Sequence, residues 1–515
     1  MRIGTNVAAI VANNALQKSQ NNLSTSIERL SSGYKINGSK DDAAGCAISE
    51  KMRAQIRGLS QAQNNTADGV SVLNTAEGAI TEIQSMLTRL KELSVQAAND
   101  VNSDDEREAI QKEIEQINNE IDRISDQTEF NTQSLINGNL SRRVYSDLQG
   151  VNQLSVSDSY TVGVYGITVT EDARQAIAIG AGSITMSSTA SITEEQAGAI
   201  NINGYKISIS EGDTLDKVMG KIIDGVNITG GSAFTVKDLN NDTAANGTDY
   251  AGYVPTADYA GSTLVIMTNQ YGSDQKMNIT CDNAELADIL GIPQAATQDG
   301  IYVEGSDVKA EIATGDDGKR IGFADSAILS TKGTVITVTD VNNKEFSMDV
   351  PGNAAGTVFD DSNNDGQSVA GAGTARTISQ EVTDVGTMSI HVGANQDQVI
   401  VIDIPAITTY SLGTEHMNVM TQYTASRAIS TVDEAINKTN KIRSRIGAYE
   451  NRFDHTTNNL EVSSENLTKS LSTMIDTDMS EEMTTYTSET VLTQAATSIL
   501  AQANERPSQV LQLLQ

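Results

Sequence analysis

The sequence has no tryptophan and is poor in cysteine, proline, histidine and positive charge. These shortages limit the kinds of fold, partner and chemistry that the chain can have. The two cysteines, Cys46 and Cys281, cannot form a disulfide framework in a chain of 515 residues. No apolar run approaches the roughly 20 residues of a membrane span, and the first residues lack the apolar stretch of a secretory signal. We therefore expect a cytoplasmic protein, or one exported without a cleaved signal peptide.

Positive charge is scarce, since 35 Lys and Arg stand against 67 Asp and Glu and leave a formal net charge of −32. Such a surplus repels phosphate backbones and anionic lipids. We therefore expect neither nucleic acid nor a membrane surface as a partner. The chain is several times longer than a typical domain of about 100–200 residues, so at least two domains are expected.

Catalytic and cofactor motifs are also missing. The three histidines, His391, His416 and His455, are far apart in the sequence and form no metalloprotease pair. Lys319 follows a glycine, but residue 313 is alanine where a phosphate-binding loop needs glycine. We expect no enzyme, and hence no catalytic, cofactor-binding or metal-binding residues.

Two acidic segments allow a chemical and a structural interpretation. Residues 361–366 match the first half of a calcium loop, but Ala372 stands where a bidentate glutamate is required, so a turn is favoured. Asp41 and Asp42 could be paired catalytic acids, but their place between a polar loop and a helix favours capping. Cys46 is interpreted as a small apolar residue inside that helix.

Proline is absent from the first 254 residues and from 406–506, which permits long helices at both ends of the chain. Apolar residues in these regions recur at spacings of three and four, which is typical of a coiled-coil seam. The N-terminal seam comprises Leu73, Ala76, Ile80, Ile83, Leu87 and Leu90, followed by Ile110, Ile114, Ile117, Ile121 and Ile124. Leu23, Ile27 and Leu30 predict a shorter helix that ends at Gly33, and the region from Ile429 to Met474 has a similar period.

Between about 141 and 387 the pattern changes to short β-branched alternations interrupted by Gly, Asn, Asp and Ser, as in 333–340. This pattern predicts strands and turns, with a tight hairpin turn at 315–318. The predicted fold class is therefore α+β: long antiparallel coiled-coil helices from both termini, with a β-rich inserted outer region.

Four segments carry a resemblance to a known family. They are Leu30-Ser-Ser-Gly33 with the following residues to Gly45, the segment 73–80, the segment 127–131 and the segment 445–452. Their sequences and their order resemble the bacterial flagellins over about residues 1–140 and 388–515. The strand pair 389–404 resembles a hairpin that many flagellins carry in D1 directly after the N-terminal helices, whereas here it comes 250 residues later. We therefore expect the insertion to precede this hairpin.

The resemblance implies four domains. Residues 1–45 and 474–515 would form D0, the inner-tube terminal helices, and 46–140 with 388–473 would form D1, a helical bundle with a β-hairpin. Residues 141–195 and 294–387 would form a β-rich outer domain, D2. Residues 196–293 resemble an outer module of flagellin and hook-associated proteins, a possible D3.

The resemblance also implies a function, namely a structural subunit that polymerises into the bacterial flagellar filament for motility. Alternatives are a hook-filament junction protein and a secreted adhesin. A filament subunit would be extracellular, and its partners would be further copies of itself, a flagellar export chaperone, the filament cap and hook-junction proteins. The residues expected to drive polymerisation are Leu23, Ile27, Leu30, Leu471, Met474, Val491 and Leu500.

The run from Leu87 to Gln96 is similar to the flagellin segment that Toll-like receptor 5 recognises. Arg89, Leu93 and Glu113 match that site, and the resemblance implies that the monomer is a receptor ligand. Leu90 and Lys91 depart from the usual Val-Arg. From the helical period we expect Arg89, Leu93 and Gln96 on one flank, beside the seam. A solvated or subunit-packing flank would explain Arg89 and Gln96 equally well.

Overall fold

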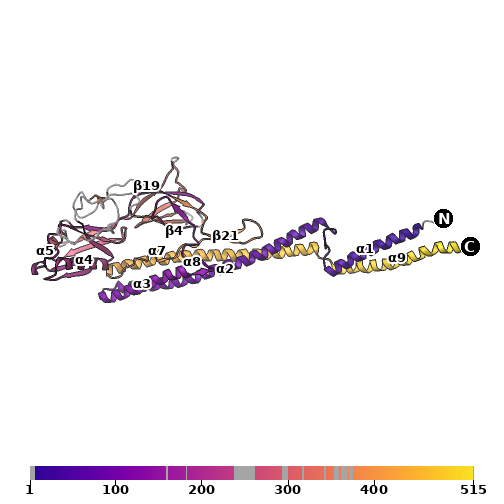
Figure 1. Cartoon of the computed structure of the whole chain (residues 1–515), viewed down its shortest axis with the longest axis horizontal. Helices are drawn as coiled ribbons and strands as arrows, with labels where there is room; N and C mark the ends of the chain where they lie inside the picture. The colour runs from indigo at the N-terminus through magenta and orange to yellow at the C-terminus, as the bar shows by residue number, and fades with distance from the viewer. Residues whose placement is uncertain are drawn as a thin grey trace. The chain divides into compact units, whose positions relative to one another are not determined.

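The structure is a computed structural model of the whole chain (Figure 1). It describes residues 6–157, 160–180, 182–236, 261–292, 300–315, 318–340, 344–352, 359–360, 369–370 and 375–513. The chain divides into two compact units, one of residues 1–70, 390–400 and 451–515 and one of residues 71–389 and 401–450. Among the described residues, no helix combines the length and apolarity that a membrane crossing requires.

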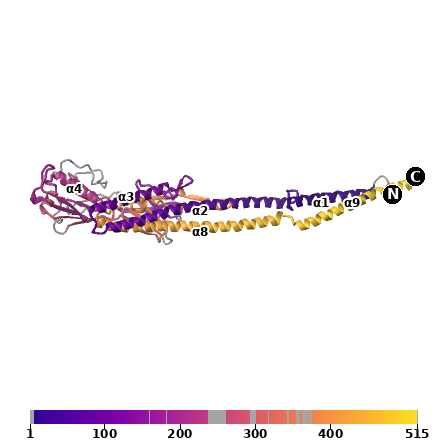
Figure 2. The same cartoon turned by 90° about the horizontal axis from the view of Figure 1, so that it is seen from below.

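The first unit is built from helices of both termini. Helix α1 (Val7–Ser32) lies beside α9 (Met479–Leu513) in both views, and the first part of α2 (Ala43–Ala97) lies beside the last part of α8 (Gln422–Ile475) (Figures 1 and 2). Asn6 caps the start of α1, and Gly33 ends it with a φ of 77°, a left-handed conformation that glycine adopts without strain. The helix end predicted at Gly33 is therefore confirmed.

The segment between α1 and α2 is tied down locally. The amide of Lys35 donates to the carbonyl of Ile475 at 2.6 Å. The Asp42 carboxylate accepts from the amides of Ala44 and Gly45 at 3.0 Å each, so Asp42 caps α2, whereas Asp41 accepts from the loop amides of Asn37 and Gly38. The capping interpretation is confirmed for Asp42, and Asp41 holds the preceding loop.

The helical part of the second unit contains the rest of α2, α3 (Asp104–Gln127) and the first part of α8. A capping box between Ser103 and Glu106 begins α3. All six residues of the predicted α2 seam have no exposed surface. On α3, Ile110, Ile114 and Ile121 are buried as predicted, but Ile117 and Ile124 are only half-buried. The coiled-coil seam is therefore confirmed on α2 and in part on α3.

Short strands follow these helices. β1 (Glu129–Phe130) pairs with β2 (Gln133–Ser134), and β20 (Met388–His391) pairs with β21 (Val399–Ile402). The hairpin predicted at 389–404 is thus present after the insertion. The one-turn helix α7 (Thr409–Leu412) comes between this hairpin and α8.

The described part of the insertion contains two large apolar cores and a smaller apolar cluster on β6, β9 and β10. Two four-stranded antiparallel sheets, in the orders β13-β5-β19-β3 and β14-β15-β16-β4, enclose the first, which includes Tyr165, Phe323 and Phe346. These strands are β3 (Val144–Ser146), β4 (Asn152–Val156), β5 (Gly163–Glu171), β13 (Lys309–Ile312), β14 (Ile328–Lys332), β15 (Val335–Thr339), β16 (Glu345–Asp349) and β19 (Arg376–Val382).

The second core lies under two further sheets, in the orders β12-β11-β7-β8 and β6-β10-β9, together with helix α4 (Leu215–Ile228). The remaining elements are β6 (Ile177–Ile179), η1 (Glu194–Gln196), β7 (Gly198–Ile202), β8 (Tyr205–Ile209), β9 (Gly231–Val236), β10 (Thr263–Thr268), β11 (Lys276–Cys281), α5 (Ala284–Ile289) and β12 (Ile301–Glu304). The strands predicted at 199–203, 262–268 and 333–340 are all present.

The second core is larger than the module predicted at 196–293. It also contains Ala176, Ile184 and Ile192 before that range and Val303 after it. The first core ends at Ala173 and resumes at Val308. The two cores therefore divide near residues 174 and 306. Both positions lie outside the range 196–293 predicted for D3.

Two predicted turns lie at the edge of what the structure describes. Thr314 and Arg320, on either side of the turn predicted at 315–318, form an antiparallel bridge, and Gly318 has a φ of 74°. Residues 316 and 317 lie outside the described residues. The segment between β17 (Phe359–Asp360) and β18 (Val369–Ala370) holds the calcium-like pattern, and its residues 361–366, with Ala372, lie outside the described residues.

Candidate assembly surface

The terminal helices α1 and α9 are held together by polar contacts. The Ser26 hydroxyl donates to the Glu482 carboxylate at 2.5 Å, and both residues are buried. Asn6, the cap of α1, donates to the carbonyl of Ala503 in α9 at 2.9 Å. Asn22 of α1 donates to the carboxylate of Glu489 in α9, also at 2.9 Å. These contacts fix the register of a pair of helices that shares little apolar surface.

Most apolar side chains of the pair remain in contact with solvent. Only Ala12 and Leu16 are buried hydrophobic residues of α1, and they reach 8% and 9% exposure. Among the side chains of the two helices that the structure describes, nine large apolar residues are 48–63% exposed: Val7, Ile10, Val11, Ile27, Met479, Met483, Val491, Leu492 and Ile499. We call these nine residues the terminal apolar surface. These side chains lie around both helices and are available for contact with another protein.

The seven predicted polymerisation residues all lie on helices of this unit. Ile27 and Val491 are exposed and belong to the terminal apolar surface. The other five, Leu23, Leu30, Leu471, Met474 and Leu500, are half-buried. The sequence prediction missed seven members of the surface, which could have been found by marking apolar residues that fall outside the buried stripe of each helix.

The predicted receptor residues lie in the second unit. Arg89 donates through Nε and Nη2 to one oxygen of Glu113, at 3.0 and 2.8 Å, and through Nη1 to Glu92 at 3.1 Å. The three charged side chains are 45–62% exposed. The hydrogen bonds that Glu113 accepts, and then the one that Glu92 accepts, raise the pKa of Arg89 above its ordinary value. Arg89 and Glu113 therefore form an exposed charged pair that links α2 to α3.

The predicted position of Leu93 is wrong. Its side chain is 1% exposed and belongs to the buried face of α2, whereas Gln96 is exposed. Lys91 points to the other side of α2, where its ammonium group contacts Asp433 of α8 at 2.6 Å. Because α2 packs between α3 and α8 here, its buried face is wide enough to include Leu93.

Groups that could support other chemistry are dispersed. Among the described residues, no three His, Cys, Asp or Glu side chains are close enough to hold a metal ion. The two cysteines are free, Cys46 half-buried and Cys281 buried. Burial, with a smaller effect of Asp282, raises the pKa of the Cys281 thiol, which makes it a poor nucleophile at neutral pH.

The two ends of the chain match family models, the bacterial flagellin N-terminal helical region over residues 3–141 and the bacterial flagellin C-terminal helical region over residues 429–514. A flagellin of Salmonella typhimurium is 32% identical, with 99% of each chain covered. Polar flagellin A of Vibrio parahaemolyticus is 30% identical and covers 100% of this chain and 99% of its own.

Solved structures of flagellar proteins are more distant. The D1-D2-D3 domains of the flagellar cap protein FliD from Escherichia coli are 13% identical, with 70% of each chain covered and a TM-score of 0.28. FliC from Burkholderia pseudomallei is 15% identical and covers 75% of this chain and 99% of its own, with a TM-score of 0.22. Scores this low do not bear on the arrangement of the whole chain. The sequence matches, which extend over nearly the full length, do decide the family: the chain belongs to the flagellins, a family of structural proteins and not of enzymes.

Proposed function

We propose that the protein is the subunit of a bacterial flagellar filament and acts in motility. The observation that carries this proposal is the terminal apolar surface, nine large side chains that one copy of the chain leaves exposed on α1 and α9. A contact between two different surfaces of identical subunits generates an open helical polymer when its rotation does not close into a ring. Burial of this surface against further copies would supply the driving force.

Charge favours a soluble monomer. A net charge of −32 makes free subunits repel one another, and added salt screens that repulsion and favours assembly. In this proposal the subunit is exported without a cleaved signal peptide and becomes part of an extracellular filament. Its other partners are an export chaperone, the filament cap and the hook-junction proteins.

Seeded assembly tests the proposal. Purified full-length protein is mixed with fragmented native filaments at moderate salt, sedimented and viewed by electron microscopy. We expect long filaments from the full chain and none from a chain that ends at residue 475, which lacks α9. Circular dichroism of the shortened chain checks that its other helices persist. Normal filaments from the shortened chain, or a monomeric full chain under all conditions, would contradict the proposal.

An exposed charged cluster favours a second role for the monomer, as a ligand of Toll-like receptor 5. Arg89, Glu92 and Glu113 present a cation and two carboxylates on adjacent helices. A receptor surface of complementary charge could pair with them. In this proposal Leu93 acts from the buried side, because its packing positions the turn of α2 that carries Arg89.

A further inference from the structure

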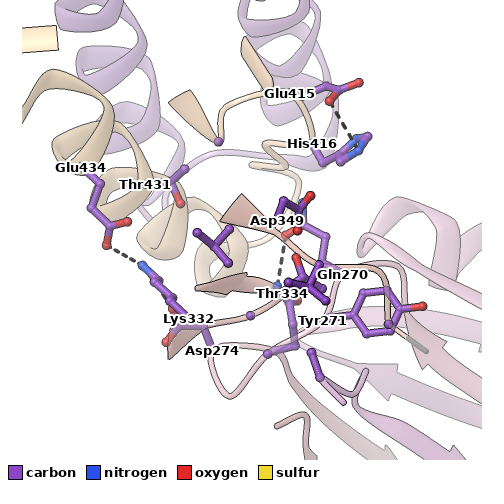
Figure 3. Close-up of a pocket in the computed structure, with 18 of the residues that line it drawn as sticks. Gln270, Tyr271, Asp274, Lys332, Thr334, Asp349, Glu415, His416, Thr431 and Glu434 are labelled. Atoms are coloured by element: carbon purple, nitrogen blue, oxygen red, sulfur yellow. Dashed lines mark hydrogen bonds and ion pairs between the residues drawn. The ribbon is translucent and has the colours of Figure 1, made fainter. Parts of the chain in front are cut away.

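A large cleft separates helix α8 from the sheets of the insertion, within the second unit. Its volume is about 980 Å³, and its lining includes Asp274 and Lys332 from the insertion and Thr431 and Glu434 from α8 (Figure 3). Protein interiors contain few voids larger than a water molecule. The faces of α8 and the insertion therefore meet without the close packing of a core.

The contacts that cross this cleft are polar. Lys332 on β14 makes an ion pair with Glu434 on α8, and the two side chains face each other in Figure 3. Lys441 of α8 pairs with Glu345 of β16 at 3.0 Å, and Arg427 donates to the Gln275 side chain at 3.0 Å.

The two large apolar cores of the insertion do not extend to helix α8. Among the described residues, neither core includes a residue of α8. Burial acts to lower the pKa of Lys332, but Glu434 and then Asp274 outweigh it and raise the pKa, so the ammonium remains charged in its place. The described contacts between α8 and the insertion named above are therefore ion pairs and a hydrogen bond, without a shared apolar core.

The insertion is joined to the helical part by a narrow neck. The entering and leaving segments pair side by side: the Arg143 amide donates to the Val385 carbonyl at 2.9 Å, and the Thr383 amide donates back to the Arg143 carbonyl at 3.1 Å. The Arg142 side chain, 12% exposed, pairs with Asp384 at 3.1 Å across the neck. A short paired neck keeps the insertion attached if the contacts at the cleft separate.

We propose that the insertion is an arm that docks reversibly on helix α8 through the ion pairs Lys332–Glu434 and Lys441–Glu345 and pivots at the neck. Each pair is half-exposed or nearly so, and such pairs are individually weak and are screened by salt. The docked arm is therefore favoured at low ionic strength, and raised ionic strength releases it. The filament would then present a different outer surface in dilute and in saline media.

A distance measurement in the full-length protein tests this proposal. Cysteines replace the exposed Ser330 of β14 and Asn437 of α8, with Cys46→Ala to remove the accessible native thiol, while Cys281 is buried and stays unlabelled. Nitroxide labels and double electron–electron resonance then report the separation of the two sites. We expect one short, narrow distance at low salt and a second, longer and broader population at about 1 M salt, where the screening length is about 3 Å.

Charge variants separate docking from rigid packing. Lys332→Glu combined with Lys441→Glu should show the longer population already at low salt. Lys441→Glu alone should show part of the longer population, and adding Glu345→Lys to it should restore the short distance, because it rebuilds that pair in reverse. Lys309→Glu is the matched control, since Lys309 pairs with Glu171 inside the insertion at 2.8 Å and should change nothing. A short distance that survives both high salt and the double charge reversal would overturn the proposal, as would a broad distribution in the parent at low salt.

Discussion

The Ser26 hydroxyl on α1 donates a 2.5 Å hydrogen bond to the Glu482 carboxylate on α9, although 456 positions separate the two residues in the sequence. Both residues are buried, with exposures of 2% and 9%, and an Arg29 nitrogen lies 3.7 Å from the second carboxylate oxygen. A buried carboxylate needs such donors, because a charge without partners in a dry environment is strongly unfavourable. This contact therefore sets the pairing of the helices that carry the terminal apolar surface.

Replacing Ser26 with alanine should weaken that pairing. Glu482 would lose its closest donor, and a buried acceptor without its partner costs about 1–3 kcal/mol. We expect a higher critical concentration for filament growth, measured by sedimentation after seeding. Ser24→Ala, at an exposed position of the same helix, is the control and should leave the critical concentration close to that of the parent. Equal values for the two variants would show that the Ser26 contact has no part in assembly.

The helices were predictable from sequence because their apolar period is strong and no proline interrupts them. Residues 73–90 show this best, since every seam position predicted there is fully buried. Leu93 was misplaced because a seam of spacing three and four describes one packed face, whereas α2 is covered by α3 on one side and α8 on the other. The buried Ser94 instead continues the seam, four residues after Leu90 and three before the buried Ala97, although its side chain is polar.

The limits of the outer module were harder to predict than its strands. β6 pairs with β10, some 90 residues later in the chain, and such a pairing leaves no local mark in the sequence. Ile184 and Ile192 lie in segments without regular strand structure, so alternation could not assign them to either core. The calcium-like pattern at 361–366 lies outside the described residues and stays a sequence prediction.

Acid should loosen the outer module through Asp213. Its carboxylate, 6% exposed, accepts from Lys217 at 2.8 Å and Lys221 at 2.6 Å, and these bonds, with one from the Ser210 amide, hold its pKa well below the usual value. The stabilisation from a lowered pKa is present above the unfolded value of about 3.9 and is lost as the pH falls through the folded value.

We therefore expect amide exchange in 198–228 to rise below about pH 4. Asp213→Asn should destabilise this region by about 1–3 kcal/mol at neutral pH and remove part of its acid sensitivity. Hydrogen exchange followed by mass spectrometry from pH 3 to 7 measures both effects. The same acid profile in parent and variant would exclude Asp213 as the cause.

Deleting residues 141–387 should leave a chain that still polymerises, into thinner filaments. The neck places the two ends of the insertion side by side, with the Arg143 amide 2.9 Å from the Val385 carbonyl, so a short join suffices. Neither large apolar core of the insertion contains a described residue of α1, α2, α3, α8 or α9. Electron microscopy measures the diameter. Loss of helical circular dichroism in the shortened chain would show instead that the insertion supports the helical bundle.

Charge reversal at Arg89 tests the receptor proposal. Arg89→Asp removes the donor to Glu113 and places three acidic groups together, whereas Lys91, about 200° away around the helix, cannot substitute. We expect at least a tenfold weaker response to the purified monomer in a cell reporter of Toll-like receptor 5, which corresponds to about 1.4 kcal/mol. Arg123→Asp, which removes another exposed arginine that pairs with a glutamate, is the control. A parental response from Arg89→Asp would refute the assignment of that site.

The central claim is that α1 and α9 leave apolar surface exposed in the single chain and bury it between copies. Hydrogen exchange of the monomer and of seeded filaments, compared over residues 7–32 and 479–513, tests this directly. The account predicts fast exchange of both segments in the monomer, because little apolar burial supports them, and strong protection of both in the filament. Filaments in which these segments exchange as fast as in the monomer would contradict it.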